Sequence, residues 1–104
     1  MRSEVLRGHV DLLVLATLRR GALHGYGIVE QLRGTSEGAF DLAEGTIYPA
    51  LYRLEGAGLL ASKWMSLGGR RRRVYRLTSR GRATLARERK EWKAFARAIE
   101  AVVS

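Results

Sequence analysis

The residues most suited to chemistry in this sequence are four consecutive arginines, Arg70 to Arg73. Seven arginines and no acidic residue occur between positions 70 and 82. A solvated protein surface normally mixes both charge signs, so a block of one sign predicts an anionic partner. Nucleic acid is the first candidate and a membrane surface the second. The alternative interpretation is that these arginines lie in solvent at the tip of a β-hairpin, where they aid solubility.

A second group of candidate residues lies on a predicted helix over positions 44–57, where Ile47, Leu51 and Leu54 have the spacing of a buried stripe. On the other side, an arginine can bind guanine or phosphate and a tyrosine hydroxyl can bind phosphate. The residues expected there to bind nucleic acid are Thr46, Tyr48, Tyr52 and Arg53, and Pro49 lies on the same side. Pro49 is expected near the first turns of the helix. Two alternatives remain, an ordinary exposed face and a capping role for Thr46.

Composition excludes several classes of chemistry. The 104-residue chain has no cysteine, which removes thiol catalysis and cysteine-ligated metals. Its two histidines, His9 and His24, lack a third ligand, so we expect turn or cap residues and neither a metal site nor a cofactor. No Ser/His/Asp set, phosphate-binding loop or carboxylate pair is apparent, and we expect no enzymatic activity.

The net charge of +9 is unevenly distributed along the chain. Residues 1–52 carry a net charge of −1 and residues 53–104 a net charge of +10. The apolar run from Leu12 to Leu18 is far shorter than the ~20 residues that span a bilayer. We therefore expect one basic, globular, cytoplasmic protein without membrane association.

Periodicity predicts the elements that position these residues. Val10 to Leu18 reads as a helix that is apolar on nearly every side, so part of it is expected in a subunit interface. After a turn at positions 21–25, a second helix is expected from Tyr26 to Arg33, ending at Gly34.

From Leu60 the hydrophobic period changes to that of a strand, and Gly68-Gly69 is suited to a tight hairpin turn before a second strand at positions 74–77. The residues of this basic hairpin, or wing, that we expect to contact the DNA backbone or minor groove are Lys63, Arg70, Arg71, Arg72 and Arg73.

A last helix is predicted from Ser79 to Val103, with Thr78 as its cap. Its apolar residues have the spacing of a seam that packs against another chain. With the first helix, they form the expected homodimer interface: Leu12, Leu15, Trp92, Phe95, Ile99 and Val102. This order of elements is that of a mainly α-helical α+β fold, a winged helix-turn-helix (residues 1–78) followed by a C-terminal dimerisation helix (residues 79–104).

Four motifs resemble those of the PadR family of transcriptional regulators, over roughly residues Leu6 to Arg82. They are Leu15-Ala16-Thr17-Leu18, His24-Gly25-Tyr26-Gly27-Ile28, Gly45-Thr46-Ile47-Tyr48-Pro49-Ala50-Leu51-Tyr52-Arg53-Leu54-Glu55 followed by Gly58-Leu59-Leu60, and Arg73-Val74-Tyr75-Arg76-Leu77-Thr78 with Gly81. The third motif is the specific one. The resemblance implies a dimeric repressor that binds double-stranded DNA, with Arg70 to Arg73 in its wing. Its recognition helix is then the helix over 44–57, and the DNA-binding residues of that helix are Thr46, Tyr48, Pro49, Tyr52 and Arg53.

The short C-terminal part is similar to that of the family's smaller subfamily and implies that any effector binds at the dimer interface. In some small members, aromatic residues of the last helix line a pore that takes flat hydrophobic compounds. Trp92 therefore has two interpretations, dimer packing and contact with a hydrophobic aromatic effector. The expected function is sequence-specific regulation of transcription, as a repressor. The alternative is a basic winged-helix adaptor that binds DNA non-specifically, a protein partner or a membrane surface.

Overall fold

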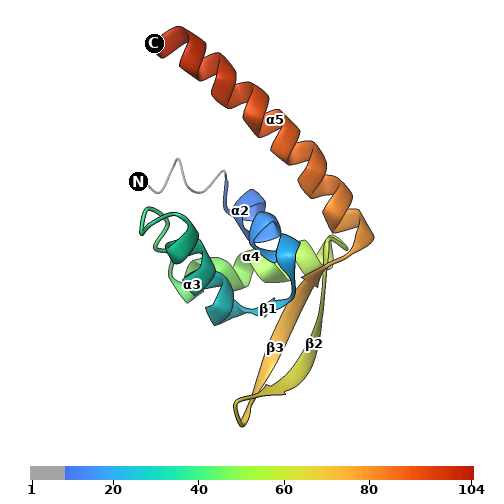
Figure 1. Cartoon of the computed structure of the whole chain (residues 1–104). Helices are drawn as coiled ribbons and strands as arrows, with labels where there is room; N and C mark the ends of the chain where they lie inside the picture. The colour runs from blue at the N-terminus through green and yellow to red at the C-terminus, as the bar shows by residue number, and fades with distance from the viewer. Residues whose placement is uncertain (1–8) are drawn as a thin grey trace.

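The computed structural model describes residues 9–104 of the chain. In chain order its elements are α2 (Val10–Thr17), the short 3-10 helix η1 (Leu18–Arg20), β1 (Leu23–His24), α3 (Gly25–Thr35), α4 (Glu44–Gly56), β2 (Leu60–Leu67), β3 (Arg70–Leu77) and α5 (Ser79–Val103) (Figure 1). This α+β arrangement confirms the expected fold class. Leu6, where the family resemblance begins, and the other residues before position 9 lie outside the described residues.

The hydrophobic core lies where α2, α3 and α4 meet, closed on one side by the sheet. Val14 and Leu15 of α2 have no exposed surface. Leu15 was expected at a subunit interface, but it belongs to the core of its own chain because α2 packs against α3, α4 and α5. Leu12 is half-buried, so it remains available on the surface of α2.

Helix α4 buries the predicted stripe and exposes the opposite side. Its buried residues are Ile47, Ala50, Leu51 and Leu54. The residue at the N-cap position is Ala43, whose carbonyl accepts hydrogen bonds from the backbone N–H groups of Thr46 and Ile47. Thr46 is therefore inside the helix, and the alternative that it caps the helix is wrong. Pro49 lies in the second turn, where its missing N–H leaves one helical hydrogen bond unformed.

The predicted hairpin is present as β2 and β3, joined by a two-residue turn. Gly68 and Gly69 have φ angles of +59° and +79°, a conformation that glycine adopts without steric cost. The antiparallel register runs from Leu60 opposite Leu77 to Leu67 opposite Arg70. The four arginines thus begin the returning strand and lie next to the turn.

A third strand, β1, was expected to be part of a turn. Leu23 pairs with Tyr75 and His24 with Val74, which places β1 on the other side of β3 from β2. Two residues are too few to show a strand period, so sequence periodicity does not reveal this element. Helix α3 then continues through Gly34 to Thr35, slightly beyond its expected end.

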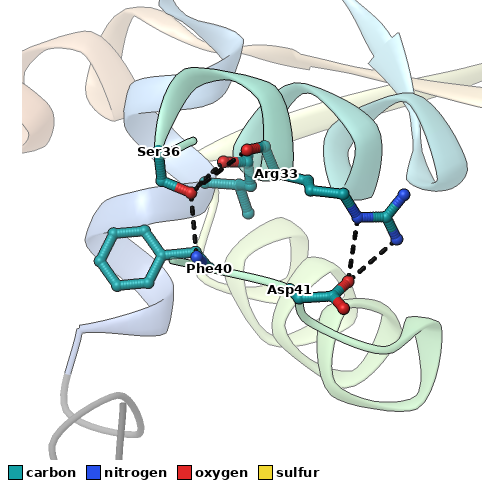
Figure 2. A network of polar contacts seen from close by, with 5 residues as sticks. Arg33, Ser36, Phe40 and Asp41 are labelled. Atoms are coloured by element: carbon teal, nitrogen blue, oxygen red, sulfur yellow. Dashed lines mark hydrogen bonds and ion pairs between the residues drawn. The ribbon is translucent and has the colours of Figure 1, made fainter. Parts of the chain in front are cut away.

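The loop between α3 and α4 is held by two side chains at the end of α3 (Figure 2). The Ser36 hydroxyl donates a hydrogen bond to the Leu32 carbonyl at 2.7 Å and accepts one from the Phe40 N–H at 2.9 Å. Arg33 pairs with Asp41, with Nε 3.0 Å from Oδ1. Both contacts tie the end of α3 to the loop that leads into α4.

Helix α5 begins at its predicted cap. The Thr78 hydroxyl accepts a hydrogen bond from the Gly81 N–H at 3.0 Å and donates one to the Gly58 carbonyl at 2.7 Å. The first turns pack on the domain and bury Thr84 and Leu85. The rest of α5 projects away, and its C-terminal end and the hairpin turn lie at opposite ends of a molecule 51 Å long (Figure 1).

Candidate nucleic-acid interface

The outward side of α4 carries most of the residues expected to bind DNA. Tyr52 is 63% exposed, and Thr46 and Pro49 are exposed on the same helix. Tyr48 is half-buried beside them. The aromatic ring of Tyr52, the hydroxyl of Thr46 and the ring of Pro49 lie on one side of the helix. From there they can contact bases or phosphates when the helix enters a groove of DNA.

Tyr48 is held by close packing against the start of α3. A β-carbon built at Gly25 would lie only 2.6 Å from Cζ and from the hydroxyl oxygen of Tyr48, so the ring occupies the space that a side chain at position 25 would need. Burial, followed by the carboxylate of Glu44, raises the pKa of the Tyr48 phenol. At neutral pH the hydroxyl therefore keeps its proton and can donate a hydrogen bond.

Arg53 extends to a different side of α4 from the tyrosines. Its guanidinium forms an ion pair with Asp11 of α2, although both side chains remain partly exposed. Arg53 lines a cleft with residues of α2 and α5, whereas Tyr48 and Tyr52 line a cleft with the hairpin. The five α4 residues therefore do not form one uniform patch.

The wing distributes its basic residues over both sides of the hairpin, because side chains alternate along a strand. Trp64 lies directly opposite Arg73, so these two share a side with Arg71. Lys63 lies opposite Val74 and shares the other side with Arg70 and Arg72. The Arg71 guanidinium carbon is 5.3 Å from the centroid of the Trp64 ring, a cation–π contact.

The Arg73 guanidinium is also engaged within the protein, by an ion pair and a hydrogen bond as well as by Trp64. Its Nη2 is 3.5 Å from Oε1 of Glu55, near the end of α4. Its Nε donates a hydrogen bond to the Ser62 hydroxyl at 2.8 Å, and that hydroxyl donates one to Oε2 of Glu55 at 2.6 Å. Arg73 also lies over Trp64, with 5.8 Å between the guanidinium carbon and the ring centroid.

Helix α4 and the wing border a common cleft of about 250 Å³. The lining residues are His24, Tyr48, Tyr52, Trp64, Arg71, Arg72, Arg73 and Tyr75. Trp64 and His24 were not expected here. Counting the strand register back from the Gly68-Gly69 turn would have placed Trp64 with the arginines, but nothing in the sequence indicates His24, because β1 brings it in.

His24 lies in an environment that disfavours its charged form. Partial burial, followed by the positive charge of Arg72, lowers the pKa of His24 below its ordinary value of 6.5. A β-carbon at Gly27 would lie 3.3 Å from the imidazole, so the ring is packed against the first turn of α3. Both His24 and His9 occupy N-cap positions, as expected for cap residues, although neither side chain makes the capping hydrogen bond.

A second surface is formed by α2 and the projecting part of α5. Its apolar residues are exposed: Trp92 by 45%, Phe95 by 59%, Ile99 by 48% and Val102 by 86%. Trp92 and Phe95 line a cleft of about 510 Å³ together with His9, Asp11, Leu12, Arg53, Glu88 and Glu91. Trp92 and Phe95 of the predicted α5 stripe therefore lie on one accessible side of the chain with Leu12, whereas Leu15 is buried.

Within residues 9–104, no helix is long and apolar enough to cross a membrane. The same part of the chain contains no group of three or more histidine, aspartate or glutamate side chains placed to hold a metal ion.

A model of the transcriptional regulator PadR-like family matches residues 14–87. The chain is 38% identical over 96 residues to a transcriptional regulator of Mycobacterium tuberculosis, and the match covers 92% of this chain and 87% of that protein. A transcriptional regulator from Clostridium thermocellum superposes with a TM-score of 0.89 at 31% identity, covering 100% of this chain and 99% of that one.

A structure of Bacillus subtilis PadR in complex with operator DNA is also similar, with a TM-score of 0.68 and 26% identity. That match covers 74% of this chain and 44% of the Bacillus subtilis chain.

Proposed function

The chain belongs to the PadR-like family of transcriptional regulators, and we propose that it is a homodimeric repressor that binds a specific double-stranded DNA sequence through α4 and the wing. Members of this family are DNA-binding regulators and not enzymes. The similar Bacillus subtilis protein was solved with operator DNA, which supports DNA as the ligand of this fold.

The observation that carries the proposal is the position of the wing beside the outward side of α4. An α-helix fits the major groove of DNA, and a basic hairpin next to it can reach phosphates or the adjacent minor groove. Tyr52 and Arg71 line the same cleft from these two elements. We assign base and phosphate contacts to Thr46, Tyr48, Pro49, Tyr52 and Arg53, and backbone contacts to Lys63, Arg70, Arg71 and Arg72.

The exposed apolar stripe of α5 supports dimerisation. Trp92, Phe95 and Ile99 are at least 45% exposed in the isolated chain, and a second copy would remove them from water. Residues 79–104 thus act as a dimerisation helix and residues 1–78 as the DNA-binding part. A two-fold dimer binds a pseudo-palindromic operator with half-sites about one helical turn, ~34 Å, apart. Repression follows from occupying a promoter, and we expect the protein in the cytoplasm with its DNA.

The cleft beside Trp92 suits an effector that is aromatic and positively charged. Trp92 and Phe95 offer ring faces, and Glu88 and Glu91 supply carboxylates, whereas Asp11 is paired with Arg53. Arg53 of the recognition helix lines the same cleft, so a ligand there would contact the element that binds DNA. Binding would then alter DNA affinity through that shared residue.

The function is tested by a gel shift that compares DNA upstream of the coding region with random DNA at ~150 mM salt, a physiological ionic strength. A specific regulator prefers the upstream DNA by about a thousandfold or more. Arg71→Gln should weaken binding to both DNAs, while Lys93→Gln, the same charge change on α5, should leave both unchanged.

The alternative, a basic winged-helix adaptor, predicts equal binding to both DNAs, and that result would overturn the specific regulator. Fluorescence titrations of a Trp64→Phe variant, in which Trp92 is the remaining tryptophan, with planar aromatic cations and phenolic acids test the effector separately. Unchanged Trp92 emission across the panel would leave dimer packing as the role of this residue.

A further inference from the structure

The wing is supported by a third strand only at its base. β1 pairs with Tyr75 and Val74, and its pairing stops there. Arg73 is the next residue of β3 toward the turn, where the hairpin continues as two strands. A two-stranded hairpin in water is marginally stable on its own, so contacts at this point decide how the wing is oriented.

Arg73 makes such contacts to the recognition helix. It joins β3 to Glu55 of α4 directly and through Ser62 of β2, so that three side chains from three elements form a closed ring of contacts. The side chains of Arg73 and Glu55 are 40% and 27% exposed, which leaves this pair less screened by water than a fully exposed one. The guanidinium also lies over Trp64.

From this geometry we propose that Arg73 is a positioning residue, which fixes the angle between the wing and α4 through Glu55 and Ser62, and does not itself bind a DNA phosphate. This inference rests on the proposed function and corrects the expectation that all four consecutive arginines bind DNA. Recognition by two rigidly joined elements requires that both fit the duplex together, so the cluster contributes to sequence specificity from a position beside the DNA.

Glu55 distinguishes this proposal from simple charge attraction. A carboxylate near the DNA-binding surface repels phosphates, so if it had no positioning role, Glu55→Gln would strengthen DNA binding. The positioning role predicts the reverse, because Glu55→Gln removes the charge that holds Arg73. The same reasoning predicts that Glu55→Gln and Arg73→Gln are not additive, since either substitution opens the same ring of contacts.

The experiment measures binding to specific and random DNA across salt concentrations for Glu55→Gln, Arg73→Gln and the double variant. We expect each single variant to lose about fivefold in affinity for the specific DNA, the double variant to lose no more, and the salt slope to stay unchanged. Arg71→Gln is the matched control and should reduce the salt slope by about 0.9. Any of three results would overturn the proposal: a similar reduction in the salt slope for Arg73→Gln, tighter DNA binding by Glu55→Gln, or an affinity loss in the double variant equal to the product of the two single losses.

A measurement without DNA separates this inference from the proposed function. In a Trp92→Phe background, Trp64 is the remaining tryptophan, and acrylamide quenching reports its accessibility. Glu55→Gln and Arg73→Gln should each raise the quenching constant of Trp64. A variant of the two that leaves this constant unchanged would refute the positioning role. If the wild-type protein does not bind DNA but the two variants still show increased quenching of Trp64, the proposed function fails and the positioning contact stands. Arg73→Lys keeps the charge and should show a smaller increase in quenching, which covers the case in which Arg73→Gln does not fold.

Discussion

The ring of Tyr48 lies against Gly25 so closely that a β-carbon at position 25 would be 2.6 Å from the tyrosine hydroxyl oxygen. Gly25 opens α3 and Tyr48 lies on the outward side of α4, so this contact ties two successive helices together at the candidate DNA surface. It gives a physical reason for a glycine between His24 and Tyr26, because any larger residue must displace the phenol.

Gly25→Ala should destabilise the fold by about 1–3 kcal/mol, the usual cost of overpacking a tight contact, and should weaken DNA binding by moving Tyr48. Gly34→Ala is the matched control, because a β-carbon there meets no atom within 4 Å and the residue is helical. It should stabilise the protein by about 0.5–1 kcal/mol. Urea unfolding distinguishes the two, and equal stabilities would contradict the packing argument.

Thr78→Ala should cost about 1 kcal/mol, because it removes the cap of α5 and the hydrogen bond to Gly58. Thr78→Ser keeps the hydroxyl and should remain within a few tenths of a kcal/mol of the wild type. Thermal unfolding of both variants checks the prediction. An alanine variant as stable as the serine variant would show that the cap contributes nothing.

Asp11→Asn should strengthen DNA binding, because it releases the Arg53 guanidinium from its ion pair. The stability cost should be below about 1 kcal/mol, as for other exposed pairs. Asp41→Asn is the control: it also frees an arginine, Arg33, but at the α3–α4 loop (Figure 2). Fluorescence anisotropy with labelled DNA measures both. Equal gains would indicate a general charge effect and no special role for Arg53.

Stability should fall as the pH drops through the range just below 6.5, because of His24. Its pKa is lowered in the folded chain by burial and by Arg72, so the unfolded chain binds more protons in this range. The contribution of His24 is complete above pH ~6.5 and is lost as the pH falls toward the lowered folded value. Urea unfolding between pH 5 and 7.5 should show less pH dependence in His24→Gln than in the wild type. His9→Gln is the control at the other histidine. If both variants changed the pH dependence of stability equally, His24 would be excluded as its specific source.

Phe95→Asp should shift the protein from dimer to monomer, because it places a charge in the exposed apolar stripe of α5, at a position 59% exposed in the single chain. Losing one well-packed aromatic at an interface costs about 2 kcal/mol or more. Ala94→Asp introduces the same charge at the neighbouring exposed position of the helix and should leave the dimer intact. Sedimentation velocity measures both, and a monomeric wild type would refute the proposed dimer.

The sequence was most informative where neighbouring residues determine the structure. The Gly68-Gly69 turn and the Thr78 cap located the hairpin and the start of α5, because turn and cap chemistry act within a few residues. The stripe of Ile47, Leu51 and Leu54 likewise identified the buried side of α4, and therefore the side that remains exposed.

Contacts between distant segments were not predictable in the same way. Arg53 pairs with Asp11, 42 positions away, and Arg73 turns from its neighbours to Glu55 because strand alternation and the tertiary fold bring them together. Leu15 is fully buried in the core of its own chain, which an apolar run alone does not reveal. Ion pairs between distant residues decide which arginines remain available on a surface. The run from Arg70 to Arg73 was therefore recognised from the sequence, but the separate role of Arg73 was not.

Apart from Tyr48, which lies on the outward side but also packs against the core, the outward residues of α4 are separate from its buried residues, and this separation bears on how the protein can diverge. The side chains that hold the fold together point inward, while Thr46, Pro49 and Tyr52 point outward and carry none of the core. Substitutions at these outward positions can accumulate during evolution with little loss of stability, so relatives of this chain can acquire new targets on an unchanged scaffold. Tyr48 and Glu55 are the constrained positions, because each also contacts another element, and a change there requires a compensating change at Gly25 or Arg73.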